Sequence, residues 1–132
     1  PLRDGLACVG VYTALLKVRF SCGFEVRTDV PEEFMSFQVV PCSIQMLVEN
    51  ALKHNRVSPG NPLYIDMVAK DYRFIVTNTI SPRMASSEES TKVGLNYIRQ
   101  QYIDLSGNDI EVIDDGKTYS VSLPLLPVQK TT

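Results

Sequence analysis

Three polar residues on one predicted helix are the first candidates for chemistry in this sequence. Asn50, Lys53 and His54 lie at positions i, i+3 and i+4, so they share one side of a helix. An Asn carbonyl oxygen is a hard ligand that suits Mg²⁺, which commonly completes its shell with waters and substrate phosphates. A Lys one turn further on can neutralise phosphate charge. The simpler alternative is a solvated polar face on which Glu49 and Lys53 form an i, i+4 ion pair.

The helix that carries these residues is predicted over 41–54. Pro41 suits a first helical turn, because its missing N–H would have no partner there. The breakers at 58–62 end the pattern. At 100° per residue, one arc is apolar and packs on a core, and it holds Ile44, Leu47, Val48, Ala51 and Leu52. The other arc is where chemistry could lie, and it holds Met46, Glu49, Asn50, Lys53 and His54.

The other elements follow from hydrophobic periodicity. Apolar residues at steps of three and four predict a leading helix over 1–20 and another over 95–105, and alternation predicts a strand at 24–28. Two antiparallel hairpins are expected, at 63–77 around Lys70-Asp71 and at 110–123 around Asp115-Gly116. A polar loop is expected at 81–92. Three helices and about five strands predict a single α/β domain, a two-layer sandwich with its helices on one face of the sheet.

Composition excludes several classes of protein. The chain has 132 residues and a formal net charge of -2, without the basic excess of a nucleic-acid binder. Its apolar runs fall far short of the roughly 20 residues that cross a bilayer. Three cysteines and one histidine disfavour a disulfide framework and a zinc site, and fit a reducing compartment. Because the chain starts at Pro1 without a signal-peptide pattern, we expect a domain excised from something longer.

A resemblance gives these patterns a family. Residues 48–55, Val-Glu-Asn-Ala-Leu-Lys-His-Asn, resemble the N box of the GHKL ATPases, in particular the ATP-binding domain of LytS-like sensor histidine kinases. Residues 16–20 resemble the segment that precedes the ATPase core in that class. Residues 94–102 resemble its G2 region with the following helix, and residues 119–125 resemble its closing strand. The resemblance therefore spans nearly the whole chain, in the right order and spacing.

The resemblance implies a fold and a function. The fold is of the Bergerat type, with three helices over a mixed sheet. The function is to bind Mg²⁺ and ATP and to donate the γ-phosphoryl group to a histidine in an upstream phosphoacceptor and dimerisation domain, so the chain would not be a self-sufficient protein-histidine kinase. A response regulator would be the further partner. The segment would be a cytoplasmic domain, without direct membrane contact, of a membrane-anchored sensor.

The resemblance also assigns roles to residues. Asn50 would hold Mg²⁺ and Lys53 the phosphates, with His54 on the ligand side. Glu49 would orient a water or polarise a neighbour, although pairing with Lys53 is the better expectation. Residues 81–93 would form the ATP lid. There Lys92 could reach phosphates, and Gly94 with Leu95 would let the backbone close over them.

The G1 box is where the sequence departs from the family pattern. The usual Asp-x-Gly-x-Gly is replaced by Asn78 and residues without glycine. Asn78 keeps an oxygen that can accept a hydrogen bond from the adenine amine, but it is equally readable as an ordinary turn residue. Two alternatives therefore stay open. One is a degenerate module that acts as an interaction domain without nucleotide, and the other is a different GHKL enzyme, such as an anti-sigma-type serine kinase.

Overall fold

The computed structural model describes residues 1–19, 24–40, 42–54, 63–79 and 88–126. One five-stranded sheet has the order β1-β2-β3-β5-β4. β1 is parallel to β2 and the remaining pairs are antiparallel, so the sheet is mixed. The elements in chain order are α1 (Leu2–Arg19), β1 (Phe24–Asp29), the 3₁₀ helix η1 (Glu32–Phe34), α2 (Ser43–His54), β2 (Leu63–Lys70), β3 (Arg73–Thr79), α3 (Glu88–Ser106), β4 (Glu111–Asp114) and β5 (Thr118–Pro124).

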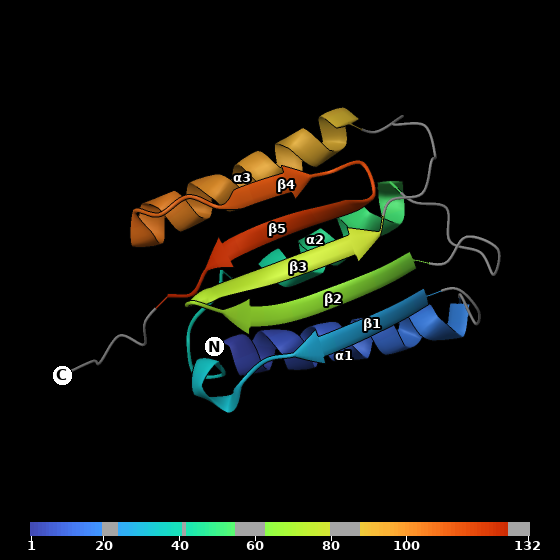
Figure 1. Cartoon of the computed structure of the whole chain (residues 1–132), viewed down its shortest axis with the longest axis horizontal. Helices are drawn as coiled ribbons and strands as arrows, with labels where there is room; N and C mark the ends of the chain where they lie inside the picture. Colours follow the sequence, from blue (N-terminus) through green and yellow to red (C-terminus); the bar gives the residue numbers. More distant parts are fainter. Residues whose placement is uncertain (20–23, 41, 55–62, 80–87, 127–132) are drawn as a thin grey trace.

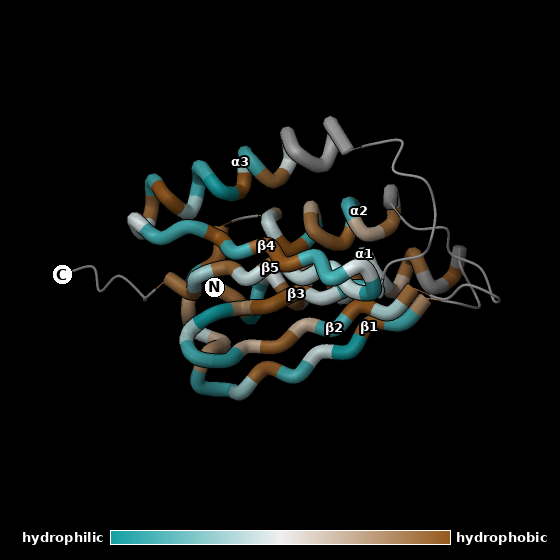
Figure 2. Tube along the Cα trace, turned by 45° about the horizontal axis from the view of Figure 1, so that its top comes forward, coloured by the Kyte–Doolittle hydropathy of each residue, from teal (hydrophilic) through white to brown (hydrophobic). Residues whose placement is uncertain are grey.

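The three α-helices cover one face of this sheet. Figure 1 shows α1, α2 and α3 behind the strands, with α1 near β1 and α3 near β4 and β5. Figure 2, turned by 45°, shows α2 and α3 on one side of the strands. The predicted two-layer α/β sandwich, with three helices over a mixed sheet of five strands, is confirmed. None of the helices in the described ranges is both long and apolar enough to cross a membrane.

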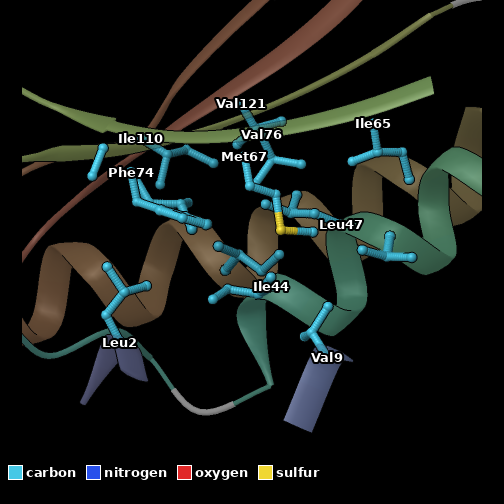
Figure 3. Close-up of a cluster of buried hydrophobic side chains, with 14 of the residues drawn as sticks. Leu2, Val9, Ile44, Leu47, Ile65, Met67, Phe74, Val76, Ile110 and Val121 are labelled. Carbon is cyan, nitrogen blue, oxygen red and sulfur yellow. The ribbon is translucent and has the colours of Figure 1, made fainter. Parts of the chain in front are cut away.

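The core lies between the helices and the sheet. In β2 and β3 buried residues alternate with more exposed ones, as the sequence alternation predicts. Figure 3 shows Met67, Phe74 and Val76 of the sheet directed toward Ile44 and Leu47 of α2. Leu2 and Val9 complete this layer from α1. The apolar arc predicted for α2 is therefore the face that holds the helix on the sheet.

Both predicted hairpins are present, and one has a shifted turn. The β2–β3 turn consists of Asp71 and Tyr72, with φ of 53° and 60°, instead of Lys70-Asp71. Positive φ at both central residues is the geometry that matches the right-handed twist of two adjoining strands. The β4–β5 turn contains Gly116 at φ 86°, as its Asp-Gly signal predicts. In both cases the turn fixes the register of the core-facing residues.

Helices α2 and α3 begin at other residues than predicted. α2 begins at Ser43, because Cys42 has φ 67° and is not helical, while Pro41 lies outside the described residues. α3 begins at Glu88, so residues 88–92 are helical and the predicted loop through Lys92 is wrong there. Periodicity missed this turn because it carries no large apolar residue, whereas two glutamates in a first turn favour a helix electrostatically. Residues 81–87 of that loop lie outside the described part of the chain.

A closed ring of hydrogen bonds fixes α3 against the start of α2. The backbone N–H of Val40 donates to the Tyr102 hydroxyl (3.1 Å), and the Ser43 hydroxyl donates to the Val40 carbonyl (2.8 Å). The Tyr102 and Ser43 hydroxyls lie 3.1 Å apart, so Tyr102 donates to Ser43 and every group is satisfied. Tyr102 is fully buried, and this burial raises its pKa. The ring sets the spacing between α2 and α3.

Candidate functional site

Asn50 lies where α2 faces α3. Val48 and Ala51 of α2 are buried toward the core, whereas Asn50 is only half-buried. A Cβ built on Gly94 of α3 would lie 3.7 Å from Asn50 Nδ2 and 4.0 Å from Asn50 Oδ1. The amide of Asn50 therefore lies next to Gly94, where α3 has no side chain. Met46, one turn earlier on α2, borders the same place, with its Cε 3.9 Å from the same position.

The amide nitrogen of Asn50 is buried without a partner. Within the described residues, Asn50 Nδ2 is the only buried side-chain nitrogen or oxygen that has no hydrogen bond. A buried polar group left unsatisfied costs about 1–3 kcal/mol, so native proteins rarely keep one without reason. Here an N–H donor and a carbonyl acceptor of one amide stand side by side, next to a glycine. This pair of groups can bind a ligand that offers an acceptor and a cation together.

Lys53 and His54 follow Asn50 by three and four residues on the same helix. α2 extends through His54, so its backbone places both residues one turn beyond Asn50 on the same side. Their side chains lie outside what the structure describes. The predicted contacts of Lys53 and His54 with phosphate thus stay predictions, and so does the pairing of Lys53 with Glu49.

Glu49 lies toward α1. Gln45 Nε2 donates to Glu49 Oε1 at 3.2 Å, which is an i, i+4 contact along α2. The pKa of Tyr12 on α1 is raised, first by burial of the phenol and then by the negative charge of Glu49. Asn50 and Glu49 are neighbours in sequence, but they point to different helices. The catalytic roles expected for Glu49 and Asn50 stay predictions.

Asn78 is the last residue of β3 that faces the core. It follows Phe74 and Val76 at alternating positions and is buried, with 7% of its surface exposed. Its Nδ2 donates to the carbonyl of Thr79 at 2.9 Å. Asn78 is therefore a strand residue and not a turn residue, and one half of its amide is engaged locally. Its Oδ1 keeps the chemistry of an acceptor.

Asn50, Asn78 and Gly94 come from elements that meet at one end of the sandwich. In Figure 1 the C-terminal ends of α2 and β3 and the N-terminal half of α3 lie at the same side of the molecule. Lys92 and Leu95 are also on α3, where Leu95 packs partly against the core and the side chain of Lys92 is not described. Gly94 is an interior residue of this helix, so its N–H lies beyond the four free donors of the helix start. The expected closure of the backbone at Gly94 and Leu95 over phosphates stays a prediction.

The donor set is one that Mg²⁺ accepts only with help from a substrate. In the described ranges no group of three His, Cys, Asp or Glu residues could hold a metal ion. A single amide oxygen fits a cation that keeps waters and substrate oxygens in its shell, as Mg²⁺ does. The unpartnered Nδ2 of Asn50 at the same place fits the anion that would accompany the cation. The residues present therefore fit a complex of Mg²⁺ with a phosphate ligand better than a metal alone.

A shallow hollow on the helix-free face of the sheet is a separate feature. It has a volume of about 300 Å³ and is lined by residues of β2 to β5, including Lys70, Arg73 and Glu111. Arg73 donates to the hydroxyl and carbonyl of Ser122 and to the carbonyl of Asp109, at 2.6, 3.0 and 3.1 Å. These bonds use the Nε and Nη2 groups of Arg73 and hold its guanidinium against the sheet. The sequence pattern of these strands does not predict the hollow.

Comparison with known proteins supports the resemblance drawn from the sequence. No family model matches the chain. The chain is 26% identical to Sensor protein LytS of Enterococcus faecalis over 142 aligned residues, covering 90% of this chain and 23% of LytS. The chain thus spans about a quarter of the length of that relative.

Solved structures share the fold. The catalytic domain of histidine kinase ThkA superposes with a TM-score of 0.61 at 22% identity, covering 96% of this chain and 95% of that domain. The cytoplasmic segment of histidine kinase QseC gives a TM-score of 0.66 at 15% identity, covering 97% of this chain and 76% of that segment. The chain therefore resembles LytS in sequence and has the fold of histidine kinase catalytic domains, which confirms its likeness to the ATP-binding domain of LytS-like sensor histidine kinases.

Proposed function

We propose that this chain is the ATP-binding catalytic domain of a sensor histidine kinase. In this proposal it binds Mg²⁺ and ATP and positions the γ-phosphoryl group for a histidine in an upstream phosphoacceptor domain of the same protein. A response regulator would receive the phosphoryl group next. The segment would be a cytoplasmic part of a membrane-anchored sensor. The similarity to LytS and the histidine kinase fold support this assignment.

The single observation that carries the proposal is the unpartnered amide of Asn50. Nδ2 can donate to a phosphate oxygen, and Oδ1 beside it can ligate the cation. When bound with ATP, Mg²⁺ would neutralise charge on the phosphates. Lys53 and Lys92 add positive charge from α2 and α3, at positions whose helical backbone is described. Phosphoryl transfer depends mostly on such positioning and charge stabilisation, which is the contribution that these residues would make.

Asn78 would select the base. Its Nδ2 donates to Thr79, and this bond fixes the plane of the amide. In that orientation Oδ1 is the group that can accept a hydrogen bond from the exocyclic amine of adenine. A neutral acceptor forfeits the stronger charge-assisted bond of an aspartate, so we expect a weaker affinity for ATP than the full G1 pattern would give.

Titration with ATP, with and without Mg²⁺, tests the proposal. We expect binding that depends on Mg²⁺ and that Asn50→Ala weakens about 10- to 150-fold, since contacts to charged groups contribute about 1.5–3 kcal/mol. Asn108→Ala is the matched control, because Asn108 is exposed beyond the far end of α3. Metal-dependent binding that survives Asn50→Ala unchanged would refute the role of Asn50.

One alternative has a specific observation in its favour. The G1 segment after β3 contains no glycine, so a degenerate module that binds partners without nucleotide remains a distinct hypothesis. The same titration separates the two, because a degenerate module would bind no ATP at millimolar concentration with or without Mg²⁺. A different GHKL kinase, such as an anti-sigma-type serine kinase, would bind ATP. The histidine-bearing helical segment expected upstream in the gene would distinguish that enzyme from a sensor kinase.

A further inference from the structure

Helix α1 is apolar on two opposite sides. One side faces the core, where Leu2 and Val9 are buried against α2 and the sheet, as Figure 3 shows. Leu6 and Leu16 are partly buried on the same side. A surface helix of a globular protein normally has one apolar stripe and a polar opposite face. In α1 the opposite face is apolar as well.

This second apolar face, the outer stripe, consists of Cys8, Val11, Leu15 and Val18. Val11, Leu15 and Val18 are 66%, 67% and 81% exposed, and Cys8 is exposed too. The spacing of three, four and three residues is the a–d pattern along which a second helix packs. Single exposed apolar residues are ordinary on protein surfaces. Four in continuous heptad register on one helix are the pattern of an unfilled helix–helix seam.

The size of the outer stripe indicates how its partner is held. From Cys8 to Val18 the helix rises about 15 Å, at 1.5 Å per residue. One contact of this length falls short of the roughly 800 Å² per partner that a stable free-standing interface buries. A partner tethered in the same polypeptide does not need that area, because a short linker gives an effective concentration in the millimolar range.

We propose that an amphipathic helix from another part of the same polypeptide packs on the outer stripe. This inference rests on the part of the proposed function that makes these residues one domain of a longer kinase, and the chain indeed spans only 23% of LytS. The four residues of the stripe carry no charge, so the partner seam must be apolar, since an unpaired buried charge is strongly destabilising. Ala7 and Ala14, both exposed beside the stripe, permit close approach of that helix.

The native thiol of Cys8 reports whether the stripe is covered. In the isolated 132-residue chain, Cys8 and Cys42 are both exposed, and Cys42 lies outside the stripe. Both thiols would be labelled with N-ethylmaleimide and measured by peptide mass spectrometry, in this chain and in the full-length polypeptide. We expect the labelling rate of Cys8, relative to Cys42, to fall at least tenfold in the full-length polypeptide.

Two matched variants test the contact itself. Leu15→Lys places a charge in the stripe and should restore fast labelling of Cys8 in the full-length polypeptide. Leu105→Lys makes the same change at an exposed position, 62% exposed, near the end of α3, and should leave Cys8 protected. Circular dichroism of both variants in the isolated chain should show an unchanged fold, because each leucine is mostly exposed.

Several results would overturn the inference. One is equal relative labelling of Cys8 in the two polypeptides, and another is protection that persists in Leu15→Lys. Protection that appears in the isolated chain and grows with its concentration would make a second copy the occupant instead. A full-length gene product that contains no further helix would also reject it. Because labelling needs no nucleotide, failure of the chain to bind ATP would leave this test intact.

Discussion

Replacing Asn50 by leucine should make the nucleotide-free protein more stable. Leucine has nearly the shape of asparagine but no polar atoms, so Asn50→Leu removes the buried, unpartnered Nδ2 while keeping the packing against Gly94. An unsatisfied buried donor costs about 1–3 kcal/mol, and the half-buried position of Asn50 favours the lower end. Leucine is also the better helix former, by a few tenths of a kcal/mol. We expect the free energy of unfolding to rise by about 1–2 kcal/mol.

A second leucine variant isolates the contribution of the amide. Asn96 is an exposed residue of α3, so Asn96→Leu brings the same helix propensity without removing a buried donor. It should change stability by no more than about 0.5 kcal/mol. Urea unfolding followed by circular dichroism suits this chain, which has no tryptophan. EDTA would be present so that no metal occupies the amide.

Nucleotide should reverse the order of stability. A ligand at 100 times its dissociation constant stabilises the wild type by about 2.7 kcal/mol, whereas Asn50→Leu, which cannot hold Mg²⁺ or phosphate, should gain little. Without Mg²⁺ and ATP, the variant should therefore unfold at a higher urea concentration than the wild type. With them, it should unfold at a lower one. If Asn50→Leu is instead less stable than Asn96→Leu without nucleotide by more than about 1 kcal/mol, the amide has a partner in the free protein. Asn50 would then not present a free amide to a ligand.

Two further predictions concern α3. Gly94→Ala should raise the free energy of unfolding without nucleotide by about 0.5–1 kcal/mol, because alanine is the better helix former and its Cβ would lie at an ordinary 3.7 Å from Asn50 Nδ2. The same methyl group would cover the amide of Asn50, so the variant should bind Mg²⁺ and ATP more weakly. Tighter binding in titrations would contradict this. Tyr102→Phe should cost about 1–3 kcal/mol by leaving the Val40 N–H unpaired. Burial raises the pKa of Tyr102 above its ordinary value of 10.0, so the folded protein keeps the phenol protonated and its stability falls as pH rises past 10. In urea unfolding at a series of pH values, Tyr102→Phe should make this alkaline loss of stability smaller. The same dependence of unfolding free energy on pH in both proteins would argue against it.

The layers of the fold could be predicted because they depend on local patterns. Alternation in β2 and β3 and the apolar arc of α2 each identify the side that meets the core, and these assignments agree with the buried residues. The start of α3 could not be found this way. Residues 88–92 contain no large apolar side chain, so periodicity is silent there even though the chain is helical. The 3₁₀ helix at Glu32–Phe34 likewise has no periodic signature.

The site could be predicted only in part, because its geometry depends on contacts between distant segments. The sequence identifies Asn50 as a candidate, but the unpaired state of its amide follows from the approach of Gly94, 44 residues further along. The sequence also places Glu49 beside Asn50. Only the packing of α1 and α3 on the two sides of α2 directs Glu49 toward Tyr12 and Asn50 toward α3.

The core face of α2 explains why an unsatisfied amide can persist on its other side. Ile44, Leu47 and Val48 are almost completely buried, and burial of such side chains stabilises by about 1.5–3 kcal/mol each. Together these contributions exceed the cost of one buried, unpaired donor several times over. The helix is therefore held on the sheet whether or not the amide finds a partner. An unfavourable group that the surrounding core holds in place in this way is expected at a functional site, where a ligand supplies the missing partner.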